Sequence, residues 1–298
     1  MNIEKRKIPL LTFAEHPDQG KKCWISLSGC NFNCKGCAAL AKQGIGRALS
    51  SENLVYLVFK SSKFIWGEMI KRAVITGGEP TLYPDYLLSL ISKLNEYGVK
   101  YFEISTNGFL LDENLLNELA QLNLNILIKL DVKAYDEKIH KEYTGKSNTN
   151  VLRTVELLAK FGQKLYKQSY PFIVRTVYIP GIVGIEEIEK IAKFVSTIDK
   201  NVCYRIEQFS PVHGGDISRR PTFEEMMDAY NIARTYLDNV IITTYLPTRP
   251  EYNYVEIRPD ELLSLFYKID EKSKSVIKSW RVKYFTIDQI LRNYKIEE

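Results

Sequence analysis

Three cysteines lie within eight residues, at Cys30, Cys34 and Cys37, and their thiolates are good ligands for zinc or iron. A closed structural zinc site or an ordinary iron–sulfur site needs four protein ligands. Here the nearby sequence offers three, because Cys23 falls in an expected strand and Cys203 is remote. We therefore expect a metal centre with one coordination position open to a substrate. The alternative is a zinc site whose fourth ligand comes from a distant part of the chain.

Short β-branched or aromatic runs alternate with amphipathic stretches from about residue 23 to residue 245, and this alternation predicts parallel strands covered by helices. Such folds place ligand sites at the carboxyl ends of strands, which is where the three cysteines fall. Periodicity alone does not separate a doubly wound sheet from an open or closed α/β barrel. The expected strands are Cys23–Ser28, Ala73–Thr76, Tyr101–Ser105, Asn125–Asp131, Phe172–Tyr178, Cys203–Gln208 and Val240–Thr244.

Amphipathic helices are expected between these strands. One is Asn150–Phe161, which Gly162 would end, and a later helical segment is expected at Asp260–Tyr267. After about residue 246 prolines interrupt a tyrosine-rich stretch, so we divide the chain into a barrel at residues 1–245 and a C-terminal extension at residues 246–298. The other clear helices are Asp85–Tyr97 and Ile185–Ile198.

The composition excludes several classes of protein. The chain has 298 residues, 45% of them hydrophobic, so it can bury a sizeable core without disulfides. Lys and Arg outnumber Asp and Glu by 41 to 36 without any run of like charge, so nucleic acid is not indicated as a partner. The N-terminal segment lacks the apolar stretch of a signal peptide, and no segment approaches ~18 uncharged apolar residues. We expect a cytoplasmic protein without a membrane span.

Two polar segments follow the second and third expected strands. Thr76–Pro80 contains two glycines, which can bring backbone carbonyls close to an ammonium group, and a proline that stiffens the exit. Ser105–Gly108 carries short hydroxyl and amide side chains that suit sugar hydroxyls, and it also has the composition of an ordinary turn. The candidate binding residues in these segments are Gly77, Gly78, Glu79, Pro80, Ser105 and Asn107.

Charged residues occur at the later strands. Asp131 and Lys133 end the fourth strand, where an ammonium could pair with a carboxylate; the alternative is a surface ion pair worth at most about 1 kcal/mol. Arg175 lies inside the fifth strand, and a buried arginine needs an anion to offset its desolvation. His213 follows the sixth strand, although a lone loop histidine is more often a surface residue than a ligand. We interpret His16 and His140 as structural or solvated residues.

Together these segments resemble the radical S-adenosylmethionine (radical SAM) superfamily. The cysteine triplet and Gly77–Pro80 (GGEP) match its signatures, and the similarity extends over roughly residues 10–215. Asp131–Lys133, the R-x-x-x-x-P-G that begins at Arg175 and the segment Pro211–Gly215 resemble the pyruvate formate-lyase activating enzyme and its relatives. The resemblance implies an α/β fold with a partial (β/α)6 TIM-type barrel.

The resemblance also implies the chemistry. In this superfamily the three cysteines hold a [4Fe–4S] cluster whose open iron binds the amino and carboxylate groups of SAM. An electron from the cluster then breaks the sulfonium bond to give a 5′-deoxyadenosyl radical. By resemblance GGEP binds the amino group, Ser105–Gly108 contacts the ribose, Lys133 lies by the cofactor and His213 lies by the ribose. A flavodoxin- or ferredoxin-like electron donor is implied as a partner. One departure is Gly36, which stands where an aromatic residue commonly precedes the third cysteine.

The order of the motifs favours a glycyl-radical-enzyme activase, which abstracts a hydrogen atom from a backbone glycine of a partner enzyme. A first alternative keeps the radical chemistry but acts on a small molecule, a nucleotide or RNA. A second alternative, from a different class, is a non-enzymatic iron–sulfur or zinc protein. GGEP and Arg175 weigh against that second alternative, because a simple metal site has no use for them.

Overall fold

The computed structural model describes residues 5–16, 19–37, 40–167, 170–211, 217, 219–244, 255–257 and 281–286. Within these residues the chain forms a ten-stranded sheet and a separate two-stranded sheet. Seven adjacent strands of the large sheet are parallel and follow chain order, which confirms the α/β class and the predicted strands to within three residues. They are β3 (Gly20–Leu27), β5 (Arg72–Gly77), β6 (Tyr101–Thr106), β7 (Asn125–Asp131), β8 (Ile173–Tyr178), β9 (Cys203–Gln208) and β10 (Val240–Thr244).

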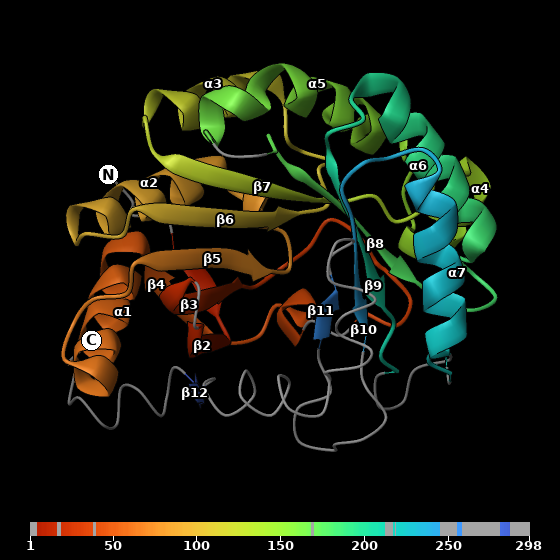
Figure 1. Ribbon diagram of the computed structural model, residues 1–298. Coiled ribbons are helices and arrows are strands. Elements are labelled where there is room, and N and C mark those ends of the chain that lie inside the picture. The colour runs from red at the N-terminus through yellow and green to blue at the C-terminus, as the bar shows by residue number, and fades with distance from the viewer. Residues whose placement is uncertain are drawn as a thin grey trace.

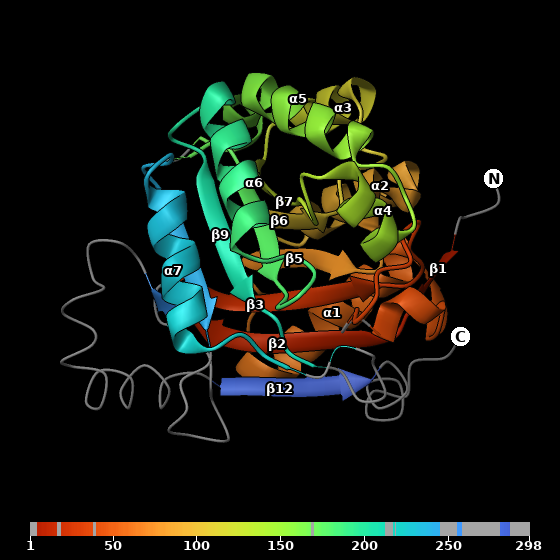
Figure 2. The same ribbon diagram turned by 90° about the vertical axis from the view of Figure 1, so that its right-hand side faces the viewer.

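Antiparallel strands extend the parallel core at both edges. β2 (Leu10–His16) pairs with β3 and β12 (Arg281–Thr286) pairs with β2, so these three strands lie side by side (Figure 2). β11 (Val255–Ile257) pairs with β10 at the opposite edge. Because β11 and β12 do not pair with one another in the described part of the chain, the sheet is open. The boundary between residues 245 and 246 stays a prediction, and Asp260–Tyr267 lies outside the described residues.

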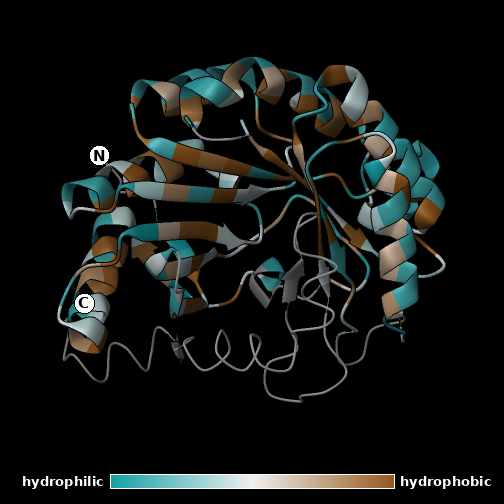
Figure 3. Cartoon of the chain, in the orientation of Figure 1, coloured by the Kyte–Doolittle hydropathy of each residue, from teal (hydrophilic) through white to brown (hydrophobic). Residues whose placement is uncertain are grey.

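Helices lie along the outer side of the curved sheet, where they form an arc around the strands (Figure 1). Apolar side chains of the helices and of one sheet face make a common core, and the outer helix surfaces are hydrophilic (Figure 3). In the part of the chain that is described, no helix is long and apolar enough to cross a membrane. The helices are α1 (Ser51–Trp66), α2 (Pro84–Glu96), α3 (Glu113–Gln121), α4 (Glu137–Thr144), α5 (Thr149–Leu165), α6 (Ile185–Ile198) and α7 (Phe223–Arg234).

The prediction that Gly162 ends the fifth helix is wrong. α5 continues to Leu165, and Gly162 lies inside it. A Cβ atom at this position would lie 2.5 Å from Cβ of Pro171, so glycine allows the chain that leads into β8 to pack directly on the helix. This glycine therefore serves close packing rather than helix termination.

A small sheet formed by β1 (Lys5–Ile8) and β4 (Arg47–Ser50) was not anticipated from the sequence. The side chains of β1 alternate, with Lys5 and Lys7 exposed and Arg6 and Ile8 buried. The backbone carbonyl of Lys7 accepts a hydrogen bond from the Ser28 N–H (2.9 Å), so β1 lies beside the chain that leaves β3.

Candidate active site

The cysteine loop, defined as residues 28–37, leaves the carboxyl end of β3. Backbone hydrogen bonds hold it from two sides: Glu79 N–H donates to the Gly29 carbonyl and Asn33 N–H donates to the Thr144 carbonyl, both at 2.8 Å. Glu79 follows β5, and Thr144 ends α4. The loop therefore lies at the carboxyl edge of the sheet, between the ends of two other βα units.

The thiols of Cys30, Cys34 and Cys37 are partly exposed and close enough to influence one another's charge. Sγ of Cys30 accepts hydrogen bonds from the Phe32 N–H (3.4 Å) and the Asn107 side-chain amide (3.8 Å), contacts that suit a thiolate on a metal centre. Among the described residues no three His, Cys, Asp or Glu side chains converge on one metal-ion position. Three thiols on one loop are a ligand set that would suit an iron–sulfur cluster with one iron left open.

The largely buried ammonium of Lys133 lies near one of these thiols. Burial raises the pKa of the Cys34 thiol to about 11, and Lys133 opposes that rise. Burial alone would lower the pKa of the Lys133 ammonium, but Asp131, Cys34 and Tyr143 together outweigh it and the pKa is raised. Lys133 therefore stays charged, and it would stabilise the thiolate that forms when Cys34 binds a metal.

The two glycines of GGEP bring this turn into contact with the cysteine loop. Gly77 has a φ of +116°, in the region that favours glycine. A Cβ atom on Gly78 would lie 1.9 Å from the Gly29 carbonyl oxygen, which no side chain could tolerate. The Gly78 N–H donates to the Leu27 carbonyl at 2.7 Å. The turn therefore needs glycine at both positions in order to lie against the cysteine loop.

The Glu79 carboxylate is buried and accepts four hydrogen bonds from the protein. Oε1 accepts from the N–H (2.9 Å) and hydroxyl (2.7 Å) of Thr81 and from the Thr106 hydroxyl (2.6 Å). Oε2 accepts from the Asn107 N–H at 2.7 Å. Burial raises the pKa of Glu79, and these hydrogen bonds oppose the rise. The side chain thus ties the GGEP turn to the end of β6, and a direct cofactor contact by Glu79 stays a prediction.

Arg6, which the sequence did not single out, joins the cysteine loop to GGEP. Its side chain is buried, and its guanidinium donates to the backbone carbonyls of Ser28 (2.6 Å), Glu79 (3.2 Å) and Pro80 (3.3 Å). It also stacks on the Tyr83 ring, 4.8 Å from the ring centre. No local pattern marks this role, because Arg6 and Glu79 are 73 residues apart.

Replacing Arg6 with methionine is expected to destabilise the fold by about 3 kcal/mol, because three buried carbonyls lose their charged donor. Denaturant unfolding of the metal-free protein measures this loss. The matched control is Lys5→Met on the same strand, where the exposed side chain should contribute less than about 0.5 kcal/mol. Equal unfolding midpoints for the two variants would show that Arg6 has no such role.

Asp131 lies between two cations at the barrel interior. Its carboxylate is 2.7 Å from a guanidinium nitrogen of Arg175 and 3.0 Å from Nζ of Lys133. Burial would raise the pKa of Asp131, but Arg175 and Lys133 lower it overall. The anion that Arg175 requires is therefore supplied by the protein itself. A second carboxylate, that of Glu207, lies 3.8 Å from the same guanidinium.

The structure brings most of the predicted site residues to one region. Asn107 bridges β6 to the cysteine loop, because its side-chain amide donates to Oδ1 of Asn31 at 2.8 Å. Ser105 is buried in β6. His213 and His16 have no described side chain. The residues that gather at the carboxyl edge or in the interior beneath it are Cys30, Cys34, Cys37, Gly77, Gly78, Glu79, Pro80, Ser105, Asn107, Asp131, Lys133 and Arg175.

The Phe209 ring packs next to Gly36 of the cysteine loop. Gly36 has a φ of +69°, and a Cβ atom there would lie 3.1 Å from the Phe209 ring and 3.0 Å from Ile217. Phe209 follows β9 and packs in one apolar cluster with Tyr143 and Cys34. An aromatic ring therefore covers this side of the cysteine loop, and it comes from a different strand end.

His140 is fully buried beside the cysteine loop. Its Nδ1 donates to the Lys146 carbonyl at 2.8 Å, and its ring packs edge-on against Phe32 with 5.6 Å between ring centres. Nε2 is buried and has no hydrogen-bond partner among the described residues. Burial lowers the pKa of His140, so the ring stays neutral. The structural interpretation of this histidine fits its surroundings.

The neutral His140 should make the protein less stable in acid. Its pKa is about 6.5 in an unfolded chain and lower in the folded one, so only the unfolded chain takes up the proton as pH falls below about 6.5. The free energy of unfolding therefore keeps the contribution of His140 above about pH 6.5. Below that pH it falls by at most about 1.4 kcal/mol per pH unit. Unfolding of metal-free protein between pH 7.5 and about pH 5 measures the slope, and His140→Asn should flatten it. An identical slope in the variant would contradict the assignment.

The family model of the radical SAM superfamily matches residues 24–195 of this chain. The chain belongs to the radical SAM superfamily. The matched span contains the cysteine loop, GGEP, Asp131 and Arg175. Members of this superfamily are enzymes of radical redox chemistry, so the non-enzymatic alternative is set aside.

Sequence relatives carry more than one named activity. A protein of Methanocaldococcus jannaschii that is named as a glycyl-radical enzyme activating enzyme is 34% identical over 236 residues, which cover 77% of this chain and 84% of the relative. A protein of Sulfolobus acidocaldarius that is named as a GTP 3′,8-cyclase is 26% identical over 226 residues, which cover 73% and 70%. Both named activities belong to radical SAM relatives, and they act on different substrates.

A solved structure supports the fold. The radical SAM methyltransferase from Sphaerobacter thermophilus superposes with a TM-score of 0.59 at 14% identity, over 78% of this chain and 68% of that one. This similarity, together with the open curved sheet, confirms the predicted partial TIM-type barrel.

Proposed function

We propose that Cys30, Cys34 and Cys37 hold a [4Fe–4S] cluster and that SAM binds beside them at the carboxyl edge. The observation that carries this proposal is one loop with three thiols, held against the GGEP turn by the backbone hydrogen bond from Glu79 to Gly29. When bound, the cluster supplies the electron that cleaves the sulfonium bond of SAM to a 5′-deoxyadenosyl radical. The expected electron donor is flavodoxin- or ferredoxin-like.

The protein's own groups would orient SAM. The backbone carbonyls of Gly77 and Gly78 are suited to its ammonium group, because those of Glu79 and Pro80 already accept hydrogen bonds from Arg6. Asp131 is shared by Arg175 (2.7 Å) and Lys133 (3.0 Å), so Lys133 is suited to bind the carboxylate of SAM as well. Ser105 and Asn107, at the end of β6, would lie toward the ribose together with His213. Phe209 and Tyr143 would exclude water from one side of the cysteine loop.

We further propose that the hydrogen donor is a backbone glycine of a partner enzyme. The relative named as a glycyl-radical enzyme activating enzyme supports this assignment, and so does the order of the motifs at Asp131, Arg175 and Pro211. Such a partner would present its glycine over the carboxyl edge, where the radical forms.

The test is anaerobic incubation of the reduced, reconstituted protein with SAM and the glycyl-radical enzyme encoded nearest to it. The expected result is an EPR doublet from a glycyl radical, together with 5′-deoxyadenosine. Release of 5′-deoxyadenosine without any protein-centred radical would exclude this substrate. It would leave SAM cleavage itself established.

A second candidate is a radical reaction on a small anionic molecule or nucleotide. The relative named as a GTP 3′,8-cyclase supports it. Tight binding to a glycyl-radical enzyme, with no binding of nucleoside triphosphates, would exclude this candidate.

A further inference from the structure

The side chain of Asn107, which follows β6, is held in one orientation. Its backbone N–H donates to Oε2 of Glu79 at 2.7 Å, and its Oδ1 accepts a hydrogen bond from the Phe109 N–H at 3.0 Å. Because Oδ1 faces a backbone donor, the other atom of this amide must be the nitrogen, Nδ2. This nitrogen donates to Oδ1 of Asn31 in the cysteine loop at 2.8 Å.

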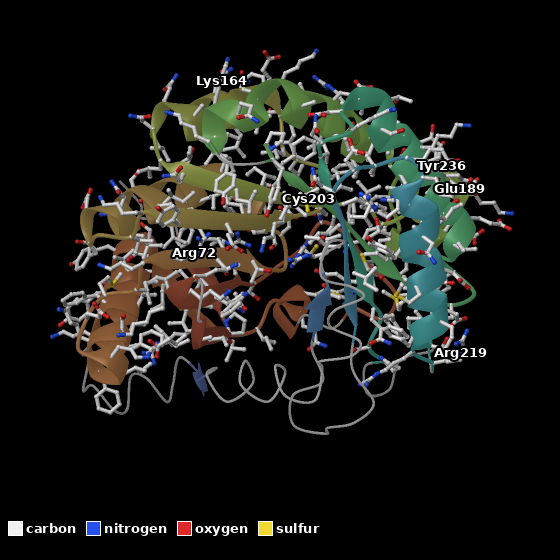
Figure 4. The ribbon with its side chains drawn as sticks, in the orientation of Figure 1. Arg72, Lys164, Glu189, Cys203, Arg219 and Tyr236 are labelled. Atoms are coloured by element: carbon white, nitrogen blue, oxygen red, sulfur yellow. The ribbon has the colours of Figure 1, made fainter. Side chains whose placement is uncertain are left out.

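The orientation of Asn107 determines that of Asn31. Since the atom of Asn107 that faces Asn31 is a donor, Asn31 must present its acceptor, Oδ1, and its Nδ2 is left with two hydrogens to donate elsewhere. Side chains fill the space inside the arc of the helices (Figure 4), and Nδ2 of Asn31 is buried and has no hydrogen-bond partner among the described residues. A buried donor without an acceptor is unfavourable, so this nitrogen is suited to a bound group that brings an acceptor.

The thiol of Cys30 lies beside this amide. Its Sγ is 3.9 Å from Oδ1 of Asn31. The same Sγ is 3.4 Å from the Phe32 backbone nitrogen and 3.8 Å from Nδ2 of Asn107, and both nitrogens donate to it. The amide of Asn31 is planar and compact, so its free NH2 group also lies in the neighbourhood of Cys30. Neutral N–H donors therefore gather around this one cysteine.

Donors of this kind favour electron uptake by an iron–sulfur cluster. Reduction adds one negative charge to the cluster, and hydrogen bonds to its sulfur atoms stabilise the added charge and raise the reduction potential. Cys34 has the ammonium of Lys133 as a neighbour, whereas Cys30 accepts from N–H groups. SAM is an alternative acceptor for Asn31, but Asn31 directly follows Cys30 in the chain and its amide lies next to Sγ. The cluster is therefore the nearer acceptor.

We propose that Asn31 donates a hydrogen bond from Nδ2 to a sulfur atom of the cluster at Cys30, and that Asn107 holds Asn31 in this donating orientation. The inference rests on the proposed function, because the cluster supplies the acceptor. Asn31 thereby raises the reduction potential of the cluster, and Asn107 is a positioning residue. Oδ1 of Asn107 keeps a second lone pair, so this role is compatible with a ribose contact. Through Glu79, the same asparagine links the GGEP turn to the cluster.

A redox titration of the anaerobically reconstituted protein, followed by EPR without SAM, tests the proposal. Asn31→Ala should lower the midpoint potential, because the reduced cluster loses a hydrogen-bond donor. We expect a shift of about tenfold in the reduction equilibrium, which is about 59 mV for one electron. The matched control is Asn33→Ala, because Asn33 belongs to the same loop and its side chain is exposed. The control should keep the potential of the wild-type protein.

Asn31→Asp separates the donor of Asn31 from its acceptor. Aspartate has nearly the same shape and keeps an oxygen for Nδ2 of Asn107, but it has no NH2 group. Its negative charge also lowers the potential, so Asn33→Asp is the control for charge. The reduction equilibrium of the Asn31→Asp protein should be shifted at least about tenfold further than that of the Asn33→Asp protein.

The wild-type protein gives a measurement that does not depend on any variant. Pulsed EPR of the reduced cluster, in protein with 15N in the side-chain amides of asparagine, should show a coupling to 15N. The coupling should weaken in the Asn31→Asp protein. If neither Asn31 variant assembled a cluster, the wild-type coupling would decide the question.

Two results would overturn the proposal: assembled Asn31 variants with the same midpoint potentials as their Asn33 counterparts, or no 15N coupling in the reduced wild-type protein. Iron content and 5′-deoxyadenosine formation are measured on the same wild-type preparation. A wild-type protein without a cluster, or without SAM cleavage, would refute the proposed function. Unchanged potentials in a wild-type background that cleaves SAM would refute only the role of Asn31, so the two failures are distinguishable.

Discussion

Replacing Cys34 with alanine is expected to abolish cluster binding and SAM cleavage together. The cluster would lose a thiolate ligand that Cys30 and Cys37 cannot replace. Two of its four irons would then have no ligand from the protein. Anaerobic reconstitution should then give iron and sulfide contents near zero. No 5′-deoxyadenosine should form from SAM and a reductant. The same result is expected for the Cys30 and Cys37 variants.

The control for this prediction is Cys23→Ala. Cys23 is fully buried in β3 and packs in the core, and burial raises the pKa of its thiol well above its usual range. Its loss should reduce stability by about 1 kcal/mol and leave the cluster intact. Full iron content and activity in the Cys34→Ala protein would refute the assignment of the cysteine loop.

The parallel strands could be predicted from the sequence because each one is a short β-branched or aromatic run with turn residues after it. The two strands of the small sheet could not be predicted from the sequence. β1 and β4 have four residues each and pair across about forty residues of chain, and nothing in the local sequence specifies that pairing. Gly162 was misread for a related reason, because its close neighbour Pro171 is a tertiary contact.

The same distinction applies to the site. The cysteine triplet and GGEP are local patterns that can be recognised in the sequence. They follow neighbouring parallel strands, so they come to lie side by side, and backbone hydrogen bonds join them. Arg6 and Phe209 could not be found in this way, because each acts on a loop from a distant part of the chain. Arg175 was expected to need an anion, and only the structure shows that Asp131 provides it.

Replacing Glu79 with alanine is expected to disrupt the carboxyl edge more than any other change outside the cysteines. The variant leaves the N–H groups of Thr81 and Asn107 without their acceptor in a buried position, while the hydroxyls of Thr81 and Thr106 can rotate to other partners. A loss of about 3 to 5 kcal/mol is expected for removal of a buried, fully hydrogen-bonded carboxylate. Denaturant unfolding of the metal-free protein measures this loss directly.

Glu79→Gln separates the role of shape from that of charge. Glutamine keeps one oxygen acceptor for the Thr81 and Thr106 donors, but its NH2 group would face the Asn107 N–H, so a loss of about 1 to 3 kcal/mol is expected. Glu118→Gln, on the exposed surface of α3, is the matched control and should change stability by less than about 0.5 kcal/mol. If Glu79→Gln were as stable as this control, the carboxylate would not be what ties GGEP to β6. Its place beside the cysteine loop would then have to be explained by direct contact with SAM.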